Sequence, residues 1–135
     1  MVTKADREII QQIDKEFATL ITSLKDLAHS VPPENLVRSA AAIEQMCGGL
    51  TSNLWDDPFE WTLPETLSNA DRVIEYLSEV DLARERTFNA IDDSALTKYI
   101  LVPSGESRML ISVLLETLVR ASEYRGRIPI NPVII

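Results

Sequence analysis

The sequence predicts an all-α protein, a four-helix bundle that forms a single domain over residues 1–135. Apolar residues recur at steps of three and four in four long segments, a spacing that places them on one face of an α-helix. Prolines, glycines or stretches without a period separate these segments, and the sequence shows no internal repeat. A chain of 135 residues with 45% hydrophobic side chains can bury one substantial core but is too short for two. Four amphipathic helices of this length are expected to pack as a bundle.

The first two helices are predicted over residues 4–29 and 33–54. The proline pair at 32–33 separates them, because proline disfavours helical geometry in the preceding residue and has no N–H to donate. The glycine pair at 48–49 interrupts the second helix, and two interpretations stay open: close approach of another part of the chain, or a functional hinge. The predicted core positions are Ile9, Ile13, Phe17, Leu20, Leu24 and Leu27, then Leu36, Ala40, Ile43, Cys47, Leu50 and Leu54.

The third helix is predicted over residues 63–91. Thr62 and Glu65 have the spacing of a capping box at its start. Its apolar stripe contains two charged residues, Asp81 and Arg84, for which two interpretations stay open. Either the buried face drifts toward neighbouring valines and leaves the charges as a surface pair, or the two line a cavity in the bundle as partners.

The fourth helix is predicted over residues 106–125, after a connector in which residues 99–103 form a short extended segment. Gly126 follows the last turn, where a left-handed C-cap is expected. The apolar tail at residues 128–135 is expected to lie along the body or against a partner chain. The predicted core arc of this helix consists of Leu110, Leu114, Thr117, Leu118 and Ala121.

Charge and composition restrict the functional classes. The 13 Lys and Arg against 21 Asp and Glu give a net charge of −8, which repels phosphate backbones and anionic lipid surfaces. The basic cluster of Arg120, Arg125 and Arg127 is too small for a nucleic-acid interface, so we expect neither a nucleic-acid nor a membrane partner. The single thiol, Cys47, fits a reducing compartment, and a cytoplasmic location is expected. We interpret Cys47 as a small buried hydrophobe and not as a nucleophile.

Residues 55–61, WDDPFEW, join the second and third helices. We interpret Asp56, Asp57 and Glu60 as a solvated acidic loop. The alternative, a calcium or magnesium site, lacks the glycine that a calcium loop needs. The interleaved aromatic residues are interpreted as a cap over the end of the bundle.

The order of the helices, the connector ending in VPSGESRML and the final helix LLETLVRASEYRGRI resemble the DinB/YfiT-like family. The resemblance covers the chain from the second helix to its end. It implies a four-helix bundle, often dimeric, in which one histidine of the second helix and two of the fourth bind a divalent metal. Some members of the family are metal-dependent hydrolases or thiol transferases. The final helix of the family commonly carries histidines four residues apart just before an Arg-Gly ending.

This sequence departs from the family at the metal-binding positions. The final-helix positions fall on Arg120 and Tyr124, and the second-helix position falls near Gln45 or Met46. None of these is a histidine, and a guanidinium adds a fixed positive charge that repels a dication. We interpret His29, the single histidine, as a helix-end residue and not as a ligand. The departures therefore predict neither a bound metal nor another cofactor.

Two functions of different classes follow. The first, which we favour, is a non-catalytic or small-ligand-binding DinB-like module. It would form a homodimer and hold a small anion, a carboxylate or a phosphate, in the former metal pocket, because guanidinium and phenol groups donate hydrogen bonds. The alternative is a metal-dependent hydrolase or thiol transferase with substitute ligands drawn from Glu44, Asp81, Glu116 or Glu123.

No catalytic residue is assigned. A buried Arg120 would need a carboxylate partner, and Glu44 or Asp81 is the nearest candidate by type. The candidate pocket residues are Arg120, Tyr124, Gln45, Met46, Glu44 and Asp81.

Overall fold

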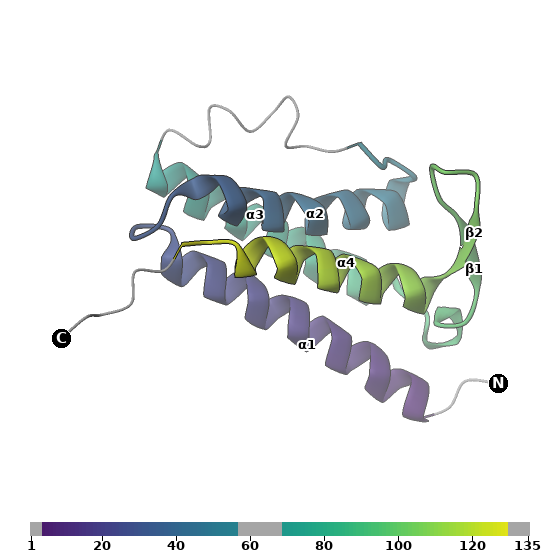
Figure 1. The fold of residues 1–135 in the computed structure, drawn as a ribbon. Helices are drawn as coiled ribbons and strands as arrows, with labels where there is room; N and C mark the ends of the chain where they lie inside the picture. The colour runs from purple at the N-terminus through teal and green to yellow at the C-terminus, as the bar shows by residue number, and fades with distance from the viewer. Residues whose placement is uncertain (1–3, 57–68, 130–135) are drawn as a thin grey trace.

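The computed structural model describes residues 4–56 and 69–129, which form a mostly helical protein with one small hairpin (Figure 1). The elements are α1 (Lys4–Leu27), α2 (Pro33–Ser52), α3 (Ala70–Ala90), the 3₁₀ helix η3 (Asp93–Ala95), β1 (Tyr99–Leu101), β2 (Ser107–Met109) and α4 (Leu110–Gly126). The predicted helical class is thus confirmed for the described part of the chain, as is an extended segment after residue 98. Within that part, no helix combines the length and the apolar character needed to cross a membrane.

The long helices pack side by side, so that each contacts two neighbours. α2 packs against α3 and α4, and α1 closes the bundle against the same two helices. α1 and α4 run in one direction, whereas α2 and α3 run in the other (Figure 1). As a result α2 ends near the hairpin and α3 begins at the opposite end of the bundle, which is the arrangement of a bundle with a crossover connection.

The hairpin sets the start of α4. The N–H of Leu110 donates to the carbonyl of Lys98 at 2.8 Å. The N–H of Ile111 donates to the carbonyl of Leu96 at 3.0 Å. These acceptors satisfy two backbone donors that the first turn of a helix leaves without an intrahelical partner. α4 begins at Leu110, later than the predicted start near residue 106, because residues 107–109 pair with β1 as an antiparallel strand.

Two other helix ends differ from the sequence prediction. α3 begins directly after Asn69 and not at residue 63, because Asn69 is extended and its side chain caps the helix by accepting a hydrogen bond from the N–H of Asp71 at 2.8 Å. The capping box predicted at residues 62–65 lies outside the described residues. Gly126 is the last residue of α4 and not a left-handed cap, and Arg127 after it has a φ of −84°.

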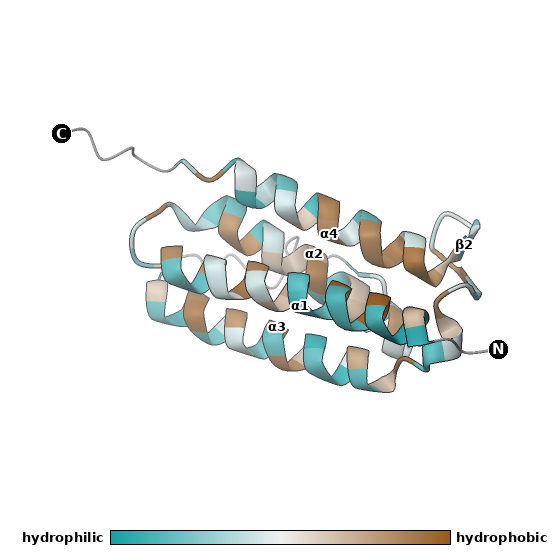
Figure 2. Ribbon diagram, turned by 90° about the horizontal axis from the view of Figure 1, so that it is seen from below, coloured by the Kyte–Doolittle hydropathy of each residue, from teal (hydrophilic) through white to brown (hydrophobic). Residues whose placement is uncertain are grey.

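The core lies between the helices, along which apolar residues recur with polar residues between them (Figure 2). The predicted stripe of α1 is wrong at its start: Ile9 is 40% exposed, whereas Ile10 is buried. Both positions fit a spacing of three and four, and only the packing decides between them. The predicted arc of α4 is buried except for Leu118, which is partly exposed. Phe17 of α1 and Phe88 of α3 meet in the core, with ring centroids 5.9 Å apart.

Asp81 and Arg84 form a pair at the seam between α1 and α3. Arg84 donates through Nε to Asp81 at 2.9 Å and through Nη1 to Asp14 of α1. The Arg84 side chain is only 12% exposed, whereas the Asp81 side chain is 37% exposed, so the pair lies at the edge of the seam. Burial lowers the pKa of Arg84, but the hydrogen bonds to the two carboxylates outweigh this effect and raise the pKa. Val73 and Val80 are buried, which agrees with the part of the first interpretation that places the buried face of the helix toward these valines.

Candidate functional site

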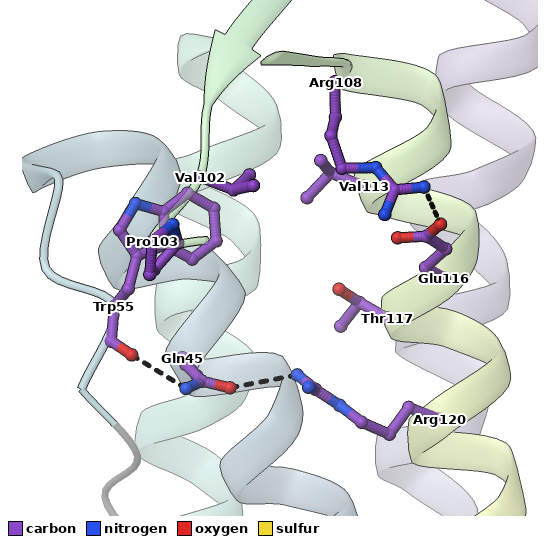
Figure 3. Close-up of a pocket in the computed structure, with 9 residues that line it drawn as sticks. All are labelled: Gln45, Trp55, Val102, Pro103, Arg108, Val113, Glu116, Thr117 and Arg120. Carbon is purple, nitrogen blue, oxygen red and sulfur yellow. Dashed lines mark hydrogen bonds and ion pairs between the residues drawn. The ribbon is translucent and has the colours of Figure 1, made fainter. Parts of the chain in front are cut away.

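A pocket lies between α2, the hairpin and α4 (Figure 3). Its volume of about 320 Å³ is at the lower end of the range for small-molecule sites, ~300 to 1,000 Å³. α4 supplies one wall, and the chain after α2 and the turn of the hairpin supply the other. The lining residues are Gln45, Trp55, Val102, Pro103, Arg108, Val113, Glu116, Thr117 and Arg120.

Two of the candidate residues, Gln45 and Arg120, meet in this pocket. Arg120 Nη2 on α4 donates to Gln45 Oε1 on α2 at 3.0 Å. Gln45 Nε2 in turn donates to the backbone carbonyl of Trp55 at 2.7 Å. The Arg120 side chain is exposed, and because Gln45 is a neutral amide, this contact does not neutralise the guanidinium charge.

A glycine pair near the end of α2 makes room for Trp55. A Cβ on Gly49 would lie 2.3 Å from the Trp55 ring, and one on Gly48 would lie 2.8 Å from the carbonyl oxygen of Leu54. The chain turns at Asn53, which has a left-handed φ of 54° and accepts a hydrogen bond from Trp55 Nε1 at 3.1 Å. Of the two interpretations of the glycine pair, these contacts support close packing.

The other arginine of the pocket is paired with a carboxylate. Arg108 on β2 donates through Nη2 to Glu116 on α4 and so joins the hairpin to the helix. With Arg108 and Arg120 against Glu116, the lining carries one more positive than negative charge, in a chain whose net charge is −8. The local charge of the pocket is therefore opposite in sign to that of the whole chain.

The rest of the lining is mostly apolar. Trp55, Val102 and Pro103 lie together on the side of the pocket opposite α4 (Figure 3). Val113 lies beside Arg108 on the α4 side, and the Thr117 hydroxyl points into the space between the two walls. A ligand in this space would meet guanidinium N–H groups, one hydroxyl and an apolar surface.

The other candidate residues lie outside the pocket lining. Met46 is buried in the core. Glu44 accepts a hydrogen bond from Tyr76 Oη of α3 at 2.5 Å. Desolvation raises the pKa of Glu44, although the hydrogen bond from Tyr76 acts in the opposite direction. Tyr124 contacts Arg127, whose guanidinium carbon lies 5.3 Å from the centre of the phenol ring.

The prediction that Arg120 pairs with Glu44 or Asp81 is wrong. Glu44 bonds to a residue of α3, and Asp81 bonds to Arg84 at the seam between α1 and α3. Consecutive residues on a helix are about 100° apart, so the rotation of α2 in the bundle decides whether residue 44 or its neighbour reaches α4. That neighbour, Gln45, is the residue that contacts Arg120.

Sequence reasoning missed the contribution of the hairpin to the site. In a helix that begins at residue 106, Arg108 and Glu116 would be eight residues apart, or about 12 Å along the axis, and could not pair. The strand at 107–109 removes this constraint and lets Arg108 reach Glu116. A signal was present in Gly105, whose φ of 86° marks the turn.

The carboxylates considered as substitute metal ligands have other surroundings. Across residues 4–56 and 69–129, no three His, Cys, Asp or Glu side chains gather in a group that could hold a metal ion. Glu116 is engaged by Arg108, and Glu123 is exposed on α4.

Cys47 is buried in α2, as its interpretation as a small buried hydrophobe requires. Burial raises the pKa of its thiol.

The structure describes only the first part of the acidic and aromatic segment at residues 55–61. Trp55 is partly buried against the core, and Asp56 is exposed. The other aromatic residues of the predicted cap, with Asp57 and Glu60 of the predicted acidic loop, lie outside the described residues. His29 lies in the turn after α1 with an exposed side chain.

No protein family, curated protein or solved structure matches this chain.

Proposed function

We propose that this protein is a non-catalytic, small-ligand-binding module that holds a small anion in the pocket between α2, α4 and the hairpin. The observation that carries the proposal is the Arg120 guanidinium in the pocket lining, whose hydrogen-bond partner there is the neutral Gln45. A guanidinium has five N–H donors, so one bond to an amide leaves donors that carboxylate or phosphate oxygens can accept. The Thr117 hydroxyl adds a further polar group on the same wall.

We also propose that the fold is of the DinB/YfiT-like kind and that this pocket replaces the metal site of that family. The packing of α2 against α4 supports the proposal. So does the contact between Gln45 and Arg120, because both stand at positions where the resemblance leads to histidines. A fixed guanidinium at such a position favours an anion over a dication.

Calorimetric titration with acetate, benzoate and inorganic phosphate tests the anion site. We expect at least one probe to bind, and Arg120→Gln to weaken that binding about tenfold or more, because a charged hydrogen bond contributes ~1.5 to 3 kcal/mol. Arg86→Gln is the matched control, since Arg86 is an exposed arginine of α3 outside the pocket lining. Both variants should keep the stability of the wild type within ~0.5 kcal/mol.

Two results would count against this function. The first is that no probe binds, or that the two arginine variants bind the probes equally well. The second is tightly held, stoichiometric nickel, zinc or manganese in the purified protein, which would support the metal-dependent hydrolase or thiol transferase with substitute ligands.

We further propose that the protein is a homodimer. Leu115 and Val119 stand one turn apart on α4 and are 44% and 58% exposed. Glu116, Arg120 and Glu123 line the same surface, so the apolar pair is flanked by both signs of charge. A surface of this kind can complement a second copy of itself across a two-fold axis.

A further inference from the structure

We propose that the ligand is a monocarboxylate with a flat apolar body, and that Glu116 selects it against dianions such as phosphate monoesters. This inference rests on the proposed anion-binding function and narrows its ligand class. It follows from the positions of the charges and of the apolar side chains around the pocket.

The charges around the pocket suit a monoanion. Because Glu116 engages Arg108, Arg120 is the guanidinium of the lining that has no carboxylate partner within it. Glu116 and Arg120 are one helical turn apart on α4, about 6 Å between their Cβ atoms, so a ligand bound to Arg120 also lies near Glu116. A carboxylate would bring the charge of the occupied pocket to zero. A phosphate monoester, at about −1.5 to −2 near pH 7, would leave excess negative charge beside Glu116.

The apolar wall suits a ligand with a flat body. Trp55, Val102 and Pro103 lie across the pocket from α4 (Figure 3). Acetate or inorganic phosphate would leave this wall in water, whereas a ring attached to the carboxylate would cover it and remove apolar surface from solvent. The indole of Trp55 offers a planar face on which an aromatic ring can stack.

Several contacts fix the position of Trp55 in the wall of the pocket. The close approach at Gly49, the turn at Asn53 and the bond from Gln45 to the Trp55 carbonyl hold this residue. Gln45 also contacts Arg120. The anion-binding group and the apolar wall are therefore linked through one side chain, which fixes the spacing that a ligand has to match.

Calorimetric titration of the full chain with four probes tests the ligand class. Benzoate should bind at least tenfold more tightly than acetate, benzamide or phenyl phosphate. The reasons differ: acetate lacks the apolar body, benzamide lacks the charge, and phenyl phosphate carries additional negative charge.

A variant of Glu116 tests the selection itself. Glu116→Gln removes the carboxylate, releases Arg108 and leaves two positive charges in the lining. Phenyl phosphate should therefore gain at least tenfold in affinity relative to benzoate. Glu85→Gln is the matched control, because Glu85 is an exposed glutamate of α3 outside the pocket lining. It should leave the ratio of the two affinities within twofold of the wild type.

The results separate this inference from the proposed function. If phenyl phosphate binds the wild type as tightly as benzoate, or if Glu116→Gln leaves the ratio of the two affinities unchanged, Glu116 does not select the monoanion, although the anion site itself is still supported. If acetate binds as tightly as benzoate, the ligand does not need a flat apolar body. If none of the anions binds, the proposed function fails and the inference fails with it.

Discussion

At the residue scale, Glu44 couples the protonation of a side chain to folding. Its carboxyl accepts the hydrogen bond from Tyr76 and is partly buried between α2 and α3. Desolvation raises its pKa from the ordinary value of 4.5, the bond from Tyr76 opposes the rise, and the charge of Glu79 adds to it. A raised pKa means that the folded state binds this proton more tightly than the unfolded state does.

We predict that Glu44 makes the protein less stable as the pH rises. Between the ordinary pKa of 4.5 and the higher pKa of the folded state, the folded state holds more protons, so the free energy of unfolding falls with increasing pH. Glu44→Gln keeps an acceptor for Tyr76 and removes the titration. Urea unfolding at several pH values between about 4 and 7 should show the variant gaining stability relative to the wild type as the pH rises. If the difference in stability between the variant and the wild type stayed constant with pH, the raised pKa of Glu44 would be contradicted.

Of the candidate site, the contact between α2 and Arg120 could be predicted from the sequence, but only to within a residue on α2. Arg120 was identified because the final helix resembles a family in which that position faces the second helix, and the contact with Gln45 agrees with this placement. The choice among residues 44, 45 and 46 depends on the rotation of α2. Helical periodicity allows neighbouring rotations, and only the packing against α3 and α4 selects one of them.

At the scale of elements, long helices were predictable and the short hairpin was not. A helix of twenty residues repeats its apolar spacing several times, so the period can be read locally. β1 and β2 have three residues each, which is too short to show the alternation of a strand. The pocket depends on these strands, because Val102, Pro103 and Arg108 reach it from the hairpin. This part of the site could therefore not be derived from sequence periodicity.

The end of α2 offers a test of how the wall of the pocket is built. Gly49→Ala places a methyl group where the Trp55 ring lies 2.3 Å away, so the ring has to move. Alanine favours a helix over glycine by ~1 kcal/mol, which offsets part of the clash. We predict that the free energy of unfolding falls by at most ~3 kcal/mol. The Trp55 fluorescence spectrum should shift, and binding of the pocket ligand should weaken.

The chain contains two tryptophans, so the measurement uses a Trp61→Phe background in which the tryptophan fluorescence comes from Trp55 alone. Gly126→Ala is the matched control, because Gly126 is the last residue of α4 and a Cβ there has no heavy atom within 4 Å. It should change the stability by no more than ~0.5 kcal/mol, because helix propensity counts less at the end of a helix than in its interior, and it should leave the spectrum unchanged. An unchanged spectrum in Gly49→Ala would show that the glycine does not position Trp55.

At the scale of the whole molecule, the exposed face of α4 determines the expected association. Sedimentation at micromolar concentration should show a dimer, and added salt should favour it, because the net charge of −8 on each chain is screened beyond ~8 Å at physiological ionic strength. Leu115→Asp should shift the protein to the monomer, because it buries a charge at the proposed interface. The control is Leu82→Asp, at a leucine of α3 that is 52% exposed. A monomer in the wild type, or equal behaviour of both variants, would contradict the dimer.

The hydrogen bonds between the start of α4 and the chain before β1 also determine how this end of the molecule opens. Because the carbonyls of Leu96 and Lys98 are the acceptors for the first N–H groups of α4, moving this segment away strips the helix of its cap. The hairpin therefore does not swing as an independent flap, and it separates from the bundle only when the first turn of α4 frays with it. Movement of the hairpin side of the pocket and amide exchange in the first turn of α4 thus belong to one cooperative opening event.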